Sequence, residues 1–340
     1  MKVVVDNKIP YLAGVLEEMG IDVVYLPGAA IKAMDVYDAD ALFVRTRTHC
    51  NKELLEGSSI QFIVTATIGY DHLDTEYLQR AGIKWTNCPG CNASSVAQYI
   101  HSSLLILSQL GLIDLPASTV GIIGVGHVGR EVEKVLLSLG CDVMLNDPPR
   151  EEAGETGFQH LQELAEKCDV LTFHTPLISN GIYPTYHLAD DIFFRMLKKQ
   201  PIIINSGRGE VVDNNALLSA LKEGFVKQAV IDTWEDEPLI DRELLKRVVI
   251  GTPHIAGYSA DGKANATRMS LQAFCDFFGF PKHFLVNPPS LPDSFVASDN
   301  PVKRALQLYD PRRDSDALKS NPDMFEWLRG NYPLRREKWN

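Results

Sequence analysis

Short apolar runs of three to five residues alternate with amphipathic stretches along most of the chain. The first runs predict strands at Val3–Val5, Val23–Leu26, Ala41–Val44, Phe62–Ala66 and Lys84–Thr86. The spacing between them predicts helices near Tyr11–Met19, Lys52–Glu56 and Thr75–Ala81. Because short buried strands that alternate with helices form parallel sheets covered on both faces, this half of the pattern predicts an α/β lobe.

A second series of runs follows a long predicted helix over Ser94–Leu110. Its strands are predicted at Val120–Gly124, Val143–Leu145, Val170–His174, Ile202–Asn205, Ala229–Asp232 and Val248–Ile250. Its helices are predicted near Val128–Leu139, Leu161–Lys167, Asp191–Leu197, Ala216–Lys222 and Arg242–Leu245. This is the number of β/α units in a complete dinucleotide-binding domain.

The remainder of the chain changes in character. A further helix is predicted over Ser259–Phe278, and Pro281–Asn300 is rich in Pro, Ser and Asp, as linkers are. The last forty residues are highly charged and carry too few apolar side chains for a core of their own. We expect them to pack against another subunit or against the main body.

Composition narrows the class of protein. The 340 residues are 45% hydrophobic and 23% charged, with a net charge of −11, which disfavours nucleic acid and anionic lipid as partners. No apolar stretch reaches the roughly 18 residues of a membrane span, and the N-terminus lacks the features of a signal peptide. Six scattered cysteines favour reduced thiols in the cytoplasm. The pair Cys88 and Cys91 lacks a second pair at metal-binding spacing, so we expect no metal.

A glycine-rich turn opens the second series of elements. Gly124, Gly126 and Gly129 give G-x-G-x-x-G between a predicted strand and a predicted helix. In that context the glycines allow a tight turn and a close approach of backbone to a pyrophosphate, which backbone N–H groups such as those of His127 and Val128 can bind. Asp147 ends the next strand, where a carboxylate accepts ribose hydroxyls and repels a 2′-phosphate. NAD is therefore favoured over NADP, although Arg150 lies near enough to leave NADP open.

Three polar residues follow consecutive predicted strands: Arg208, Glu237 and His254. Ligands bind outside the carboxyl ends of strands in open α/β sheets, so the three loops can face one crevice. Oxidation of an alcohol needs a base for the proton, and histidine titrates in the useful range. A carboxylate can orient that histidine, and an arginine can hold a substrate carboxylate. The trio predicts a dehydrogenase of a hydroxy acid.

These loops resemble those of the D-isomer-specific 2-hydroxyacid dehydrogenases, over about residues 1–280. The resemblance implies two doubly wound parallel-sheet lobes around a cleft, one flavodoxin-like and one Rossmann. It places a substrate domain at 1–95, an NAD domain at 96–257, a return helix at 258–283, and a linker and dimerisation segment at 284–340. Within the family, Val5–Tyr11, Val44–Thr46, Thr65–His72, Asn146–Arg150 and Tyr309–Asp314 are similar to members that oxidise 4-phosphoerythronate in pyridoxal phosphate biosynthesis.

The resemblance also assigns residues. It implies that Arg208, Glu237 and His254 are catalytic and that Thr46, Thr67 and Tyr258 contact substrate. It implies that NAD is contacted by the glycine-rich turn and by Asp147, Thr175, Ser206, Asp232 and Gly257. Because the substrate's phosphate needs a cation, Arg45 or Arg47 is a further candidate; if the strand continued that far, both would share one face and Thr46 the other.

One departure and two alternatives qualify this interpretation. The family's C-terminal region usually continues well beyond Asn331–Pro333, whereas this chain ends at Asn340; a homodimer is still expected, with a smaller or differently arranged interface. The first alternative is a family member that acts on glycerate or 3-phosphoglycerate. The second is an NAD-sensing corepressor, which would need no catalytic histidine.

Overall fold

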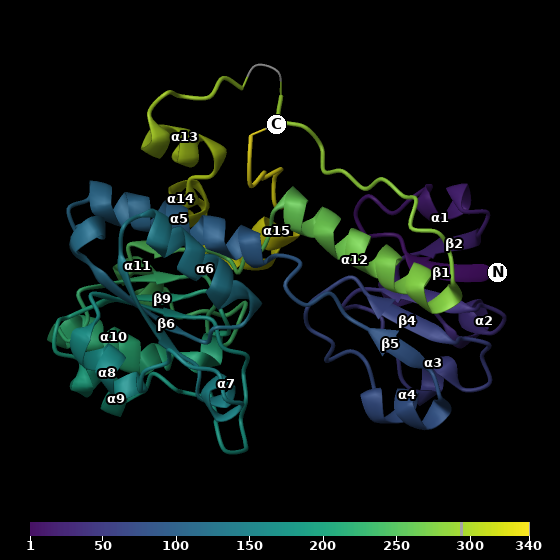
Figure 1. Cartoon of the computed structure of the whole chain (residues 1–340), viewed down its shortest axis with the longest axis horizontal. Helices are drawn as coiled ribbons and strands as arrows, with labels where there is room; N and C mark the ends of the chain where they lie inside the picture. Colours follow the sequence, from purple (N-terminus) through teal and green to yellow (C-terminus); the bar gives the residue numbers. More distant parts are fainter. Residues whose placement is uncertain (293–294, 340) are drawn as a thin grey trace. The chain divides into compact units, whose positions relative to one another are not determined.

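A computed structural model describes residues 1–292 and 295–339 of the chain (Figure 1). The chain divides into two compact units. Unit 1 consists of Met1–Asn92 and Ser259–Ser290, and unit 2 consists of Ala93–Tyr258 and Leu291–Asn340. The chain therefore passes from unit 1 to unit 2, returns to unit 1, and ends in unit 2.

Unit 1 contains a parallel sheet with the strand order β2-β1-β3-β4-β5 among its described residues, which is the flavodoxin-like order. The strands are β1 (Lys2–Asp6), β2 (Asp22–Leu26), β3 (Ala41–Val44), β4 (Phe62–Thr65) and β5 (Lys84–Thr86). The helices are α1 (Val15–Glu18), α2 (Ala33–Val36), α3 (Lys52–Leu55), α4 (Thr75–Ala81) and α12 (Ala260–Phe278), with a helical turn η1 (Gly28–Ala30).

Alternate side chains of the unit 1 strands enter two cores, as a pleated strand requires. Val3, Val5 and Phe43 pack with Leu271 and Phe274 of α12. The residues between them in sequence, such as Val4 and Leu42, pack in a second cluster with residues of α2, α3 and α4. Helix α12, which is remote in sequence, therefore completes one face of the N-terminal sheet.

Unit 2 contains a parallel sheet with the order β11-β10-β9-β8-β6-β7 in the described chain. The strands are β6 (Thr119–Ile123), β7 (Asp142–Asn146), β8 (Val170–Phe173), β9 (Ile202–Asn205), β10 (Gln228–Ile231) and β11 (Ile250–Gly251). Phe158 forms one isolated parallel bridge to Leu145 of β7. With Phe158 placed beside β7, the positions from Phe158 to β10 follow the Rossmann order 3-2-1-4-5-6, and β11 adds a seventh position beside β10.

Helices cover both faces of this sheet, with α5 and α6 on one face and α8, α9 and α10 on the other (Figure 1). The principal helices are α5 (Ala93–Gln109), α6 (His127–Ser138), α7 (Pro148–Glu152), α8 (Leu161–Lys167), α9 (Asp191–Met196), α10 (Asn214–Glu223) and α11 (Arg242–Arg247). Helical turns η2 (Leu115–Ala117) and η3 (Gly209–Val211) lie between them.

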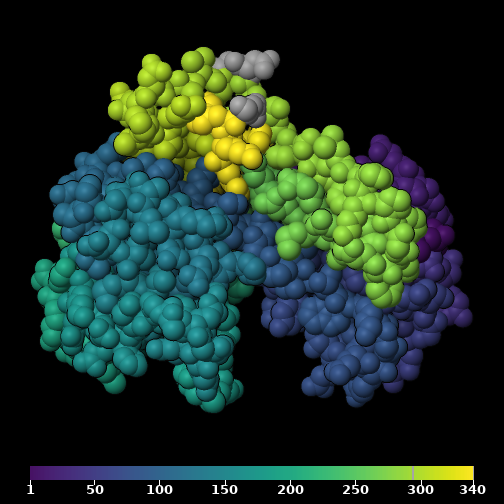
Figure 2. Space-filling view, in the orientation of Figure 1, coloured from purple at the N-terminus to yellow at the C-terminus, as the bar shows by residue number. Residues whose placement is uncertain are grey.

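The C-terminal segment packs into unit 2. It forms α13 (Pro301–Leu308), α14 (Pro311–Ser320), the turn η4 (Pro322–Met324) and α15 (Phe325–Gly330). Tyr309, Leu318 and Phe325 are buried in the two cores of this unit. Figure 2 shows the last residues, in yellow, against the blue surface of α5. The dimerisation role expected for residues 284–340 stays a prediction.

The structure differs from the sequence-based expectations at specific residues. The helix predicted from Tyr11 begins at Val15, because Tyr11 and Gly14 adopt positive φ angles of 61° and 87°. The strand predicted to include Gly124 ends at Ile123, because Gly124 turns at a φ of 89°. Among the described residues, no helix is both long enough and apolar enough to traverse a bilayer.

Candidate active site

The loops that carry Arg208, Glu237 and His254 leave adjacent parallel strands at the same edge of the unit 2 sheet. Asn205, the last residue of β9, pairs with Ile231 of β10, and Ile231 pairs with Gly251 of β11. The three loops also contact one another directly. A Cβ on Gly209 would collide with the carbonyl group of Trp234, so the Arg208 loop rests on the loop that leads to Glu237. The structure thus places the three loops together within one unit.

Glu237 and His254 form a hydrogen-bonded pair. The Nδ1 atom of His254 lies 2.8 Å and 3.1 Å from the two carboxyl oxygens of Glu237. The side chains are 27% and 18% exposed, which leaves the pair accessible from solvent. Since a carboxylate accepts hydrogen bonds, Nδ1 carries the proton of the neutral imidazole and Nε2 carries the lone pair. Nε2 has no hydrogen-bond partner among the described residues, so it can accept a proton from a substrate.

The backbone of His254 is held in an unusual conformation. Its φ is 56°, in the left-handed region, which costs a non-glycine residue on the order of 1–3 kcal/mol. Its N–H donates to the carbonyl oxygen of Asp232 (2.8 Å). The Asp232 carboxyl group then accepts the N–H groups of Ile255 and Ala256 (both 2.8 Å) and the hydroxyl of Thr252 (2.6 Å). Asp232 therefore fixes the loop from both sides of the histidine.

Asp232 itself is almost completely buried. Burial raises its pKa, whereas the charge of His254 and the hydrogen bonds to the carboxyl group oppose that rise. Both carboxyl oxygens are engaged by the His254 loop in this structure. The predicted contact of Asp232 with NAD stays a prediction.

Arg208 is exposed and its loop is ordered by Asn205. The Asn205 side chain donates to the Arg208 carbonyl (2.9 Å) and accepts the Gly207 N–H (3.1 Å). The guanidinium donates to the Gly207 carbonyl (2.9 Å) and has no carboxylate partner in the described part of the chain. An exposed arginine without a protein counter-ion is suited to bind an anionic substrate group.

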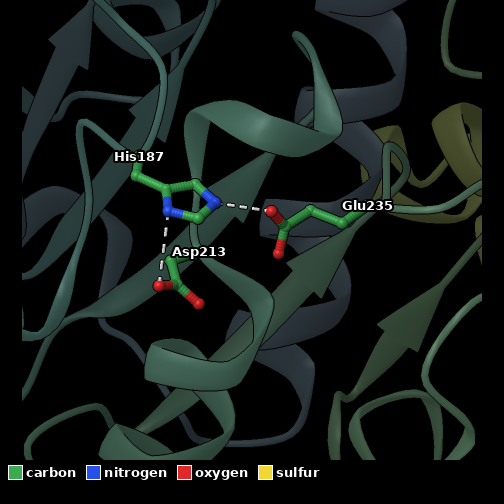
Figure 3. Close-up of side chains that lie close together, drawn as sticks. All are labelled: His187, Asp213 and Glu235. Atoms are coloured by element: carbon green, nitrogen blue, oxygen red, sulfur yellow. Dashed lines mark hydrogen bonds and ion pairs between the residues drawn. The ribbon is translucent and has the colours of Figure 1, made fainter.

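A bracket formed by His187, Asp213 and Glu235 links the segment before α9 to the loops of Arg208 and Glu237 (Figure 3). The Nε2 atom of His187 lies 2.6 Å from Glu235, and its Nδ1 atom lies 3.5 Å from Asp213. Asp213 caps α10 after the Arg208 loop, and Glu235 lies two residues before Glu237. Opposite nitrogens of one imidazole face different carboxylates, so the ring itself links the acidic groups and no shared ion is required.

The glycine-rich turn has the geometry that a dinucleotide needs. Gly124 allows the turn, and a Cβ on Gly129 would collide with the Gly124 carbonyl, so α6 packs tightly on β6. A Cβ on Gly126 would meet open space, which leaves room for a ligand beside the backbone. Arg130 is the first residue of α6 whose N–H bonds back, to the Gly126 carbonyl (3.0 Å). The N–H groups before it, including those of His127 and Val128, are therefore available to a pyrophosphate.

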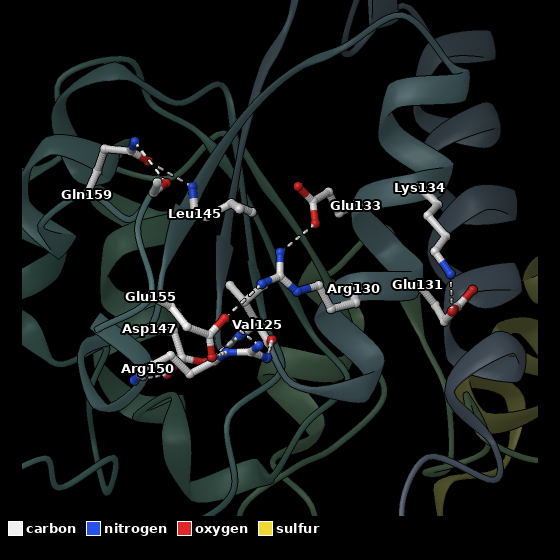
Figure 4. Close-up of polar contacts among 11 residues, drawn as sticks. Val125, Arg130, Glu131, Glu133, Lys134, Leu145, Asp147, Arg150, Glu155 and Gln159 are labelled. Carbon is white, nitrogen blue, oxygen red and sulfur yellow. Dashed lines mark hydrogen bonds and ion pairs between the residues drawn. The ribbon is translucent and has the colours of Figure 1, made fainter. Parts of the chain in front are cut away.

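Asp147 and its neighbours define the ribose end of this site (Figure 4). The Asp147 carboxylate accepts the Val125 N–H (2.8 Å) and caps α7. The guanidinium of Arg150 is already engaged by protein groups. It donates to the Val125 carbonyl (2.5 Å) and pairs with Glu155 through two hydrogen bonds of 2.7 and 2.8 Å. Side-chain bonding to Glu155 raises the pKa of Arg150. An arginine that is already paired with a carboxylate is a poor candidate for holding a 2′-phosphate.

A cavity of about 480 Å³ adjoins this turn. It is lined by Gly124, Gly126, Asn146, Asp147, Pro148, His174, Thr175, Pro176, Ile178 and Tyr183, among others. Two buried polar atoms of this lining, Thr175 Oγ1 and His174 Nδ1, lack hydrogen-bond partners, as does Ser206 Oγ. Buried orphan atoms of this kind indicate a ligand that would satisfy them. Burial lowers the pKa of His174 to about 3, so its imidazole is neutral at ordinary pH.

The predicted substrate residues of unit 1 lie in different local settings. Strand β3 ends at Val44, so the period-two arrangement of Arg45 and Arg47 does not extend to them. Arg45 is half-buried and donates to the Lys8 carbonyl (3.0 Å). Arg47 is exposed and lines a separate cavity with Lys32 and His49. The condition for that shared face, a strand that continues as far as Arg47, is therefore not met.

Two other predicted contacts already have protein partners. The Thr67 hydroxyl donates to the Gly69 carbonyl (2.8 Å) and lies 2.7 Å from Thr65 Oγ1, whereas Thr46 is exposed in the turn. The Tyr258 hydroxyl accepts a hydrogen bond from Arg329 of α15 (3.1 Å). Sequence reasoning missed Arg329, because nothing local in its segment points to the loop after His254.

Comparison with known proteins supports the predicted membership of the 2-hydroxyacid dehydrogenase family. Residues 106–256 match the model of the D-isomer specific 2-hydroxyacid dehydrogenase, NAD binding domain. The erythronate-4-phosphate dehydrogenase of Bacteroides fragilis is 56% identical over 339 residues, covering 99% of this chain and 97% of its own. The enzyme of the same name from Escherichia coli is 44% identical over 352 residues, covering 100% and 93%. The chain belongs to the erythronate-4-phosphate dehydrogenases of the D-isomer-specific 2-hydroxyacid dehydrogenase family.

Solved structures of the wider family have the same fold. D-2-hydroxyisocaproate dehydrogenase superimposes with a TM-score of 0.68 at 23% identity, covering 84% of this chain and 100% of that chain. The NAD⁺-bound 3-phosphoglycerate dehydrogenase of Entamoeba histolytica gives 0.66 at 25% identity, covering 84% and 98%. As a member of this family the chain is an NAD-dependent dehydrogenase, and the glycine turn, Asp147 and the orphaned Thr175 fit that cofactor.

Proposed function

We propose that the chain oxidises the 2-hydroxyl group of 4-phospho-D-erythronate to the 2-oxo acid, 3-hydroxy-2-oxo-4-phosphobutanoate, as a step of pyridoxal 5′-phosphate biosynthesis. The substrate follows from the activity for which relatives that are 44–56% identical over almost the whole chain are named. The reaction type is carried by one observation: Glu237 engages Nδ1 of His254 and leaves Nε2 as a base. NAD supplies the hydride acceptor when it is bound.

Each member of the trio has a distinct task. His254 Nε2 removes the proton of the 2-hydroxyl as its carbon loses the hydride. Glu237, 2.8 Å from Nδ1, stabilises the imidazolium that results. Arg208, which lacks a carboxylate partner among the described residues, binds the substrate carboxylate and polarises the adjacent oxygen. Thr46, Thr67 and Tyr258 contact the remainder of the substrate in this proposal, and Gly257 and Ser206 contact the cofactor.

We assign the substrate's phosphate to Arg45. Arg45 is half-buried. The pKa of Lys263 is lowered first by the burial of Lys263 itself and second by the charge of Arg45. Two cations near one another in a partly buried setting favour a bound dianion, which relieves their repulsion. Arg47 lies on its own cavity with Lys32 and His49. A homodimer in the cytoplasm completes the proposal, with no nucleic acid, membrane or metal as partner.

A substrate panel tests the assignment. The purified chain is assayed with NAD and 4-phospho-D-erythronate, D-glycerate or 3-phosphoglycerate, and NADH absorbance is followed. We expect kcat/KM for 4-phospho-D-erythronate to exceed the others by about a hundredfold. His254→Asn is the matched control for non-enzymatic reduction of NAD.

Other outcomes separate the competing functions. A higher kcat/KM for 3-phosphoglycerate or D-glycerate would assign the chain to another activity of the family. Tight binding of NAD without turnover of any acid would favour the NAD-sensing corepressor.

A further inference from the structure

Arg335, near the C-terminus, is an arginine with only 2% of its surface exposed. Its guanidinium donates to the carbonyl oxygens of Ile255 (3.2 Å) and Ala256 (3.1 Å) in the loop that follows His254. It also donates to α5, at the Ser95 carbonyl (2.5 Å) and the Gln98 side chain (2.8 Å). These acceptors are all neutral, so in the described chain the buried cation is directed at three backbone carbonyls and one amide side chain rather than at a carboxylate.

The opposite side of the same backbone is held by the Asp232 carboxyl group. The peptide group between residues 255 and 256 donates its N–H to Asp232 (2.8 Å) and accepts from Arg335 at its carbonyl (3.2 Å). A buried anion and a buried cation thus face each other across one peptide group. Hydrogen bonds in series polarise one another, so each charge strengthens the contact made by the other.

This peptide group is directly linked to the base. His254 precedes Ile255 and has a positive φ of 56°, a conformation that persists only where the surroundings enforce it. Asp232 holds the His254 N–H through its own carbonyl. Loosening the 255–256 peptide would free the loop to relax, and the imidazole would then lose its alignment on Glu237.

The ring of Tyr309 anchors Arg335 from another side. The guanidinium carbon lies 3.7 Å from the ring centroid, and Tyr309 is itself buried in the core of unit 2. A planar guanidinium can stack on a ring and still donate in its own plane, which a lysine ammonium cannot do. The site is therefore built for arginine, and its supporting residues come from α5, from the C-terminal segment and from the loop after β11.

We propose that Arg335 is a positioning residue of the dehydrogenase: with Asp232 it clamps the 255–256 peptide and so fixes the orientation of His254 for proton transfer. The C-terminal segment thereby supports the catalytic pair of its own chain. This inference rests on the proposed function for the identity of the base. It assigns the segment a task separate from the dimerisation that its position in the family implies.

The test compares kcat with KM in Arg335→Met and Arg335→Lys. Misplacement of a catalytic group by about 1 Å can cost about a hundredfold, so we expect kcat of Arg335→Met to fall between about tenfold and a hundredfold. KM should stay within about twofold, because Arg335 touches no substrate. Arg335→Lys should recover only part of the loss. If Arg335→Met does not fold, kcat of the Lys variant decides, because a lysine keeps the charge without spanning the acceptors.

Glu337→Ala is the matched control. Glu337 accepts a hydrogen bond from Ser95 (2.6 Å), so its loss loosens the same segment and leaves in place the hydrogen bonds of Arg335 to residues 255 and 256. We expect its kcat to stay within about twofold of wild type. Equal losses in Glu337→Ala and Arg335→Met, or a lowered Tm for Arg335→Met with kcat unchanged, would mean that Arg335 is merely an anchor for the segment.

A second measurement is independent of the substrate. In protein labelled with ¹⁵N-histidine, the ring signals of His254 are assigned with the His254→Asn variant at a pH where the ring is neutral. Wild type and Glu337→Ala should give the Nδ1–H form, and Arg335→Met a mixture of tautomers. An unchanged His254 spectrum in Arg335→Met overturns the proposal, whereas failure of wild type to oxidise 4-phospho-D-erythronate affects the substrate assignment alone.

Discussion

Nδ1 of His254 lies 2.8 Å from Oε2 of Glu237, although α11 and β11 separate the two residues along the sequence. Glu237 also accepts the Trp234 N–H (3.0 Å), which orients its carboxyl group toward the ring. The contact fixes which nitrogen is protonated, and it places a negative charge beside the imidazolium that proton transfer creates. The two residues should therefore act as one unit.

Non-additive kinetics should reveal that unit. His254→Asn should lower kcat by about 10²–10⁴-fold, the range for loss of a general base. Glu237→Gln keeps a hydrogen-bonding side chain but removes the charge, and should give a smaller loss. The double variant should be little slower than His254→Asn, since Glu237 acts through the histidine. Multiplicative losses in a complete cycle of kcat measurements would contradict the pairing.

The preference for NAD over NADP should depend on Asp147 and on Glu155, which forms an ion pair with Arg150. Asp147→Asn removes the charge that opposes a 2′-phosphate, and the ratio of kcat/KM for NAD over NADP should fall by about tenfold. Adding Glu155→Gln should lower it further, because Arg150 loses its ion pair. Glu133→Gln is the control: in the described chain Glu133 pairs with Arg130, which also pairs with Glu155, and not with Arg150. An unchanged ratio in the double variant would reject this account.

The His187 bracket should stabilise the fold without a metal ion. His187→Leu leaves Asp213 and Glu235 without the ring between them, and loss of such partners costs about 1–3 kcal/mol. Chemical denaturation should show that decrease in the free energy of unfolding. Treatment of wild type with a chelator should leave stability and kcat unchanged. Loss of activity on chelation, with recovery on adding zinc, would mean that an ion occupies the bracket.

Local spacing predicted much of the cofactor site. Gly124, Gly126, Gly129 and Asp147 each act within one strand, turn and helix, so their pattern carries the geometry. Phe158 escaped prediction because a single bridge has no period to recognise. The common face of Arg45 and Arg47 depended on a longer strand, and apolar spacing alone did not indicate that β3 ends at Val44.

The supports of the catalytic loop could not be predicted in the same way. Arg335 lies about eighty residues beyond the loop that it holds, and no short pattern joins the two. Arginine is also mostly exposed in proteins, so an arginine in a charged tail predicts solvent rather than core. Asp232, whose contact with the cofactor stays a prediction, also accepts hydrogen bonds from Thr252, Ile255 and Ala256 through its carboxyl group, and no local pattern indicates this second role.

The stability of the chain should depend on pH through His174. Burial lowers its pKa from 6.5 to about 3 in the folded state. The unfolded chain therefore binds the extra proton between these values, and folding stability falls with decreasing pH at up to about 1.4 kcal/mol per unit. Stability is fully present above pH 6.5 and is lost as pH falls toward 3. His174→Asn should lack this contribution, so the difference between its unfolding free energy and that of wild type should change across this window. Parallel curves for the two proteins would contradict a neutral buried His174.

KM values for acids with and without a phosphate should show which of Arg45 and Arg47 binds the phosphate of the substrate. Arg45 is half-buried and held on the Lys8 carbonyl, and its charge contributes to the lowered pKa of Lys263. A bound phosphate dianion would offset that repulsion, so Arg45→Gln should raise KM for 4-phospho-D-erythronate by at least about tenfold, or roughly 1.4 kcal/mol. KM for D-erythronate, which lacks the phosphate, should change by less than about twofold. Arg47→Gln is the matched control, since Arg47 is exposed on a different cavity, and it should leave both KM values nearly unchanged. Equal increases for both acids in Arg45→Gln would exclude a phosphate role, and a selective increase in Arg47→Gln would transfer that role to the cavity of Lys32 and His49.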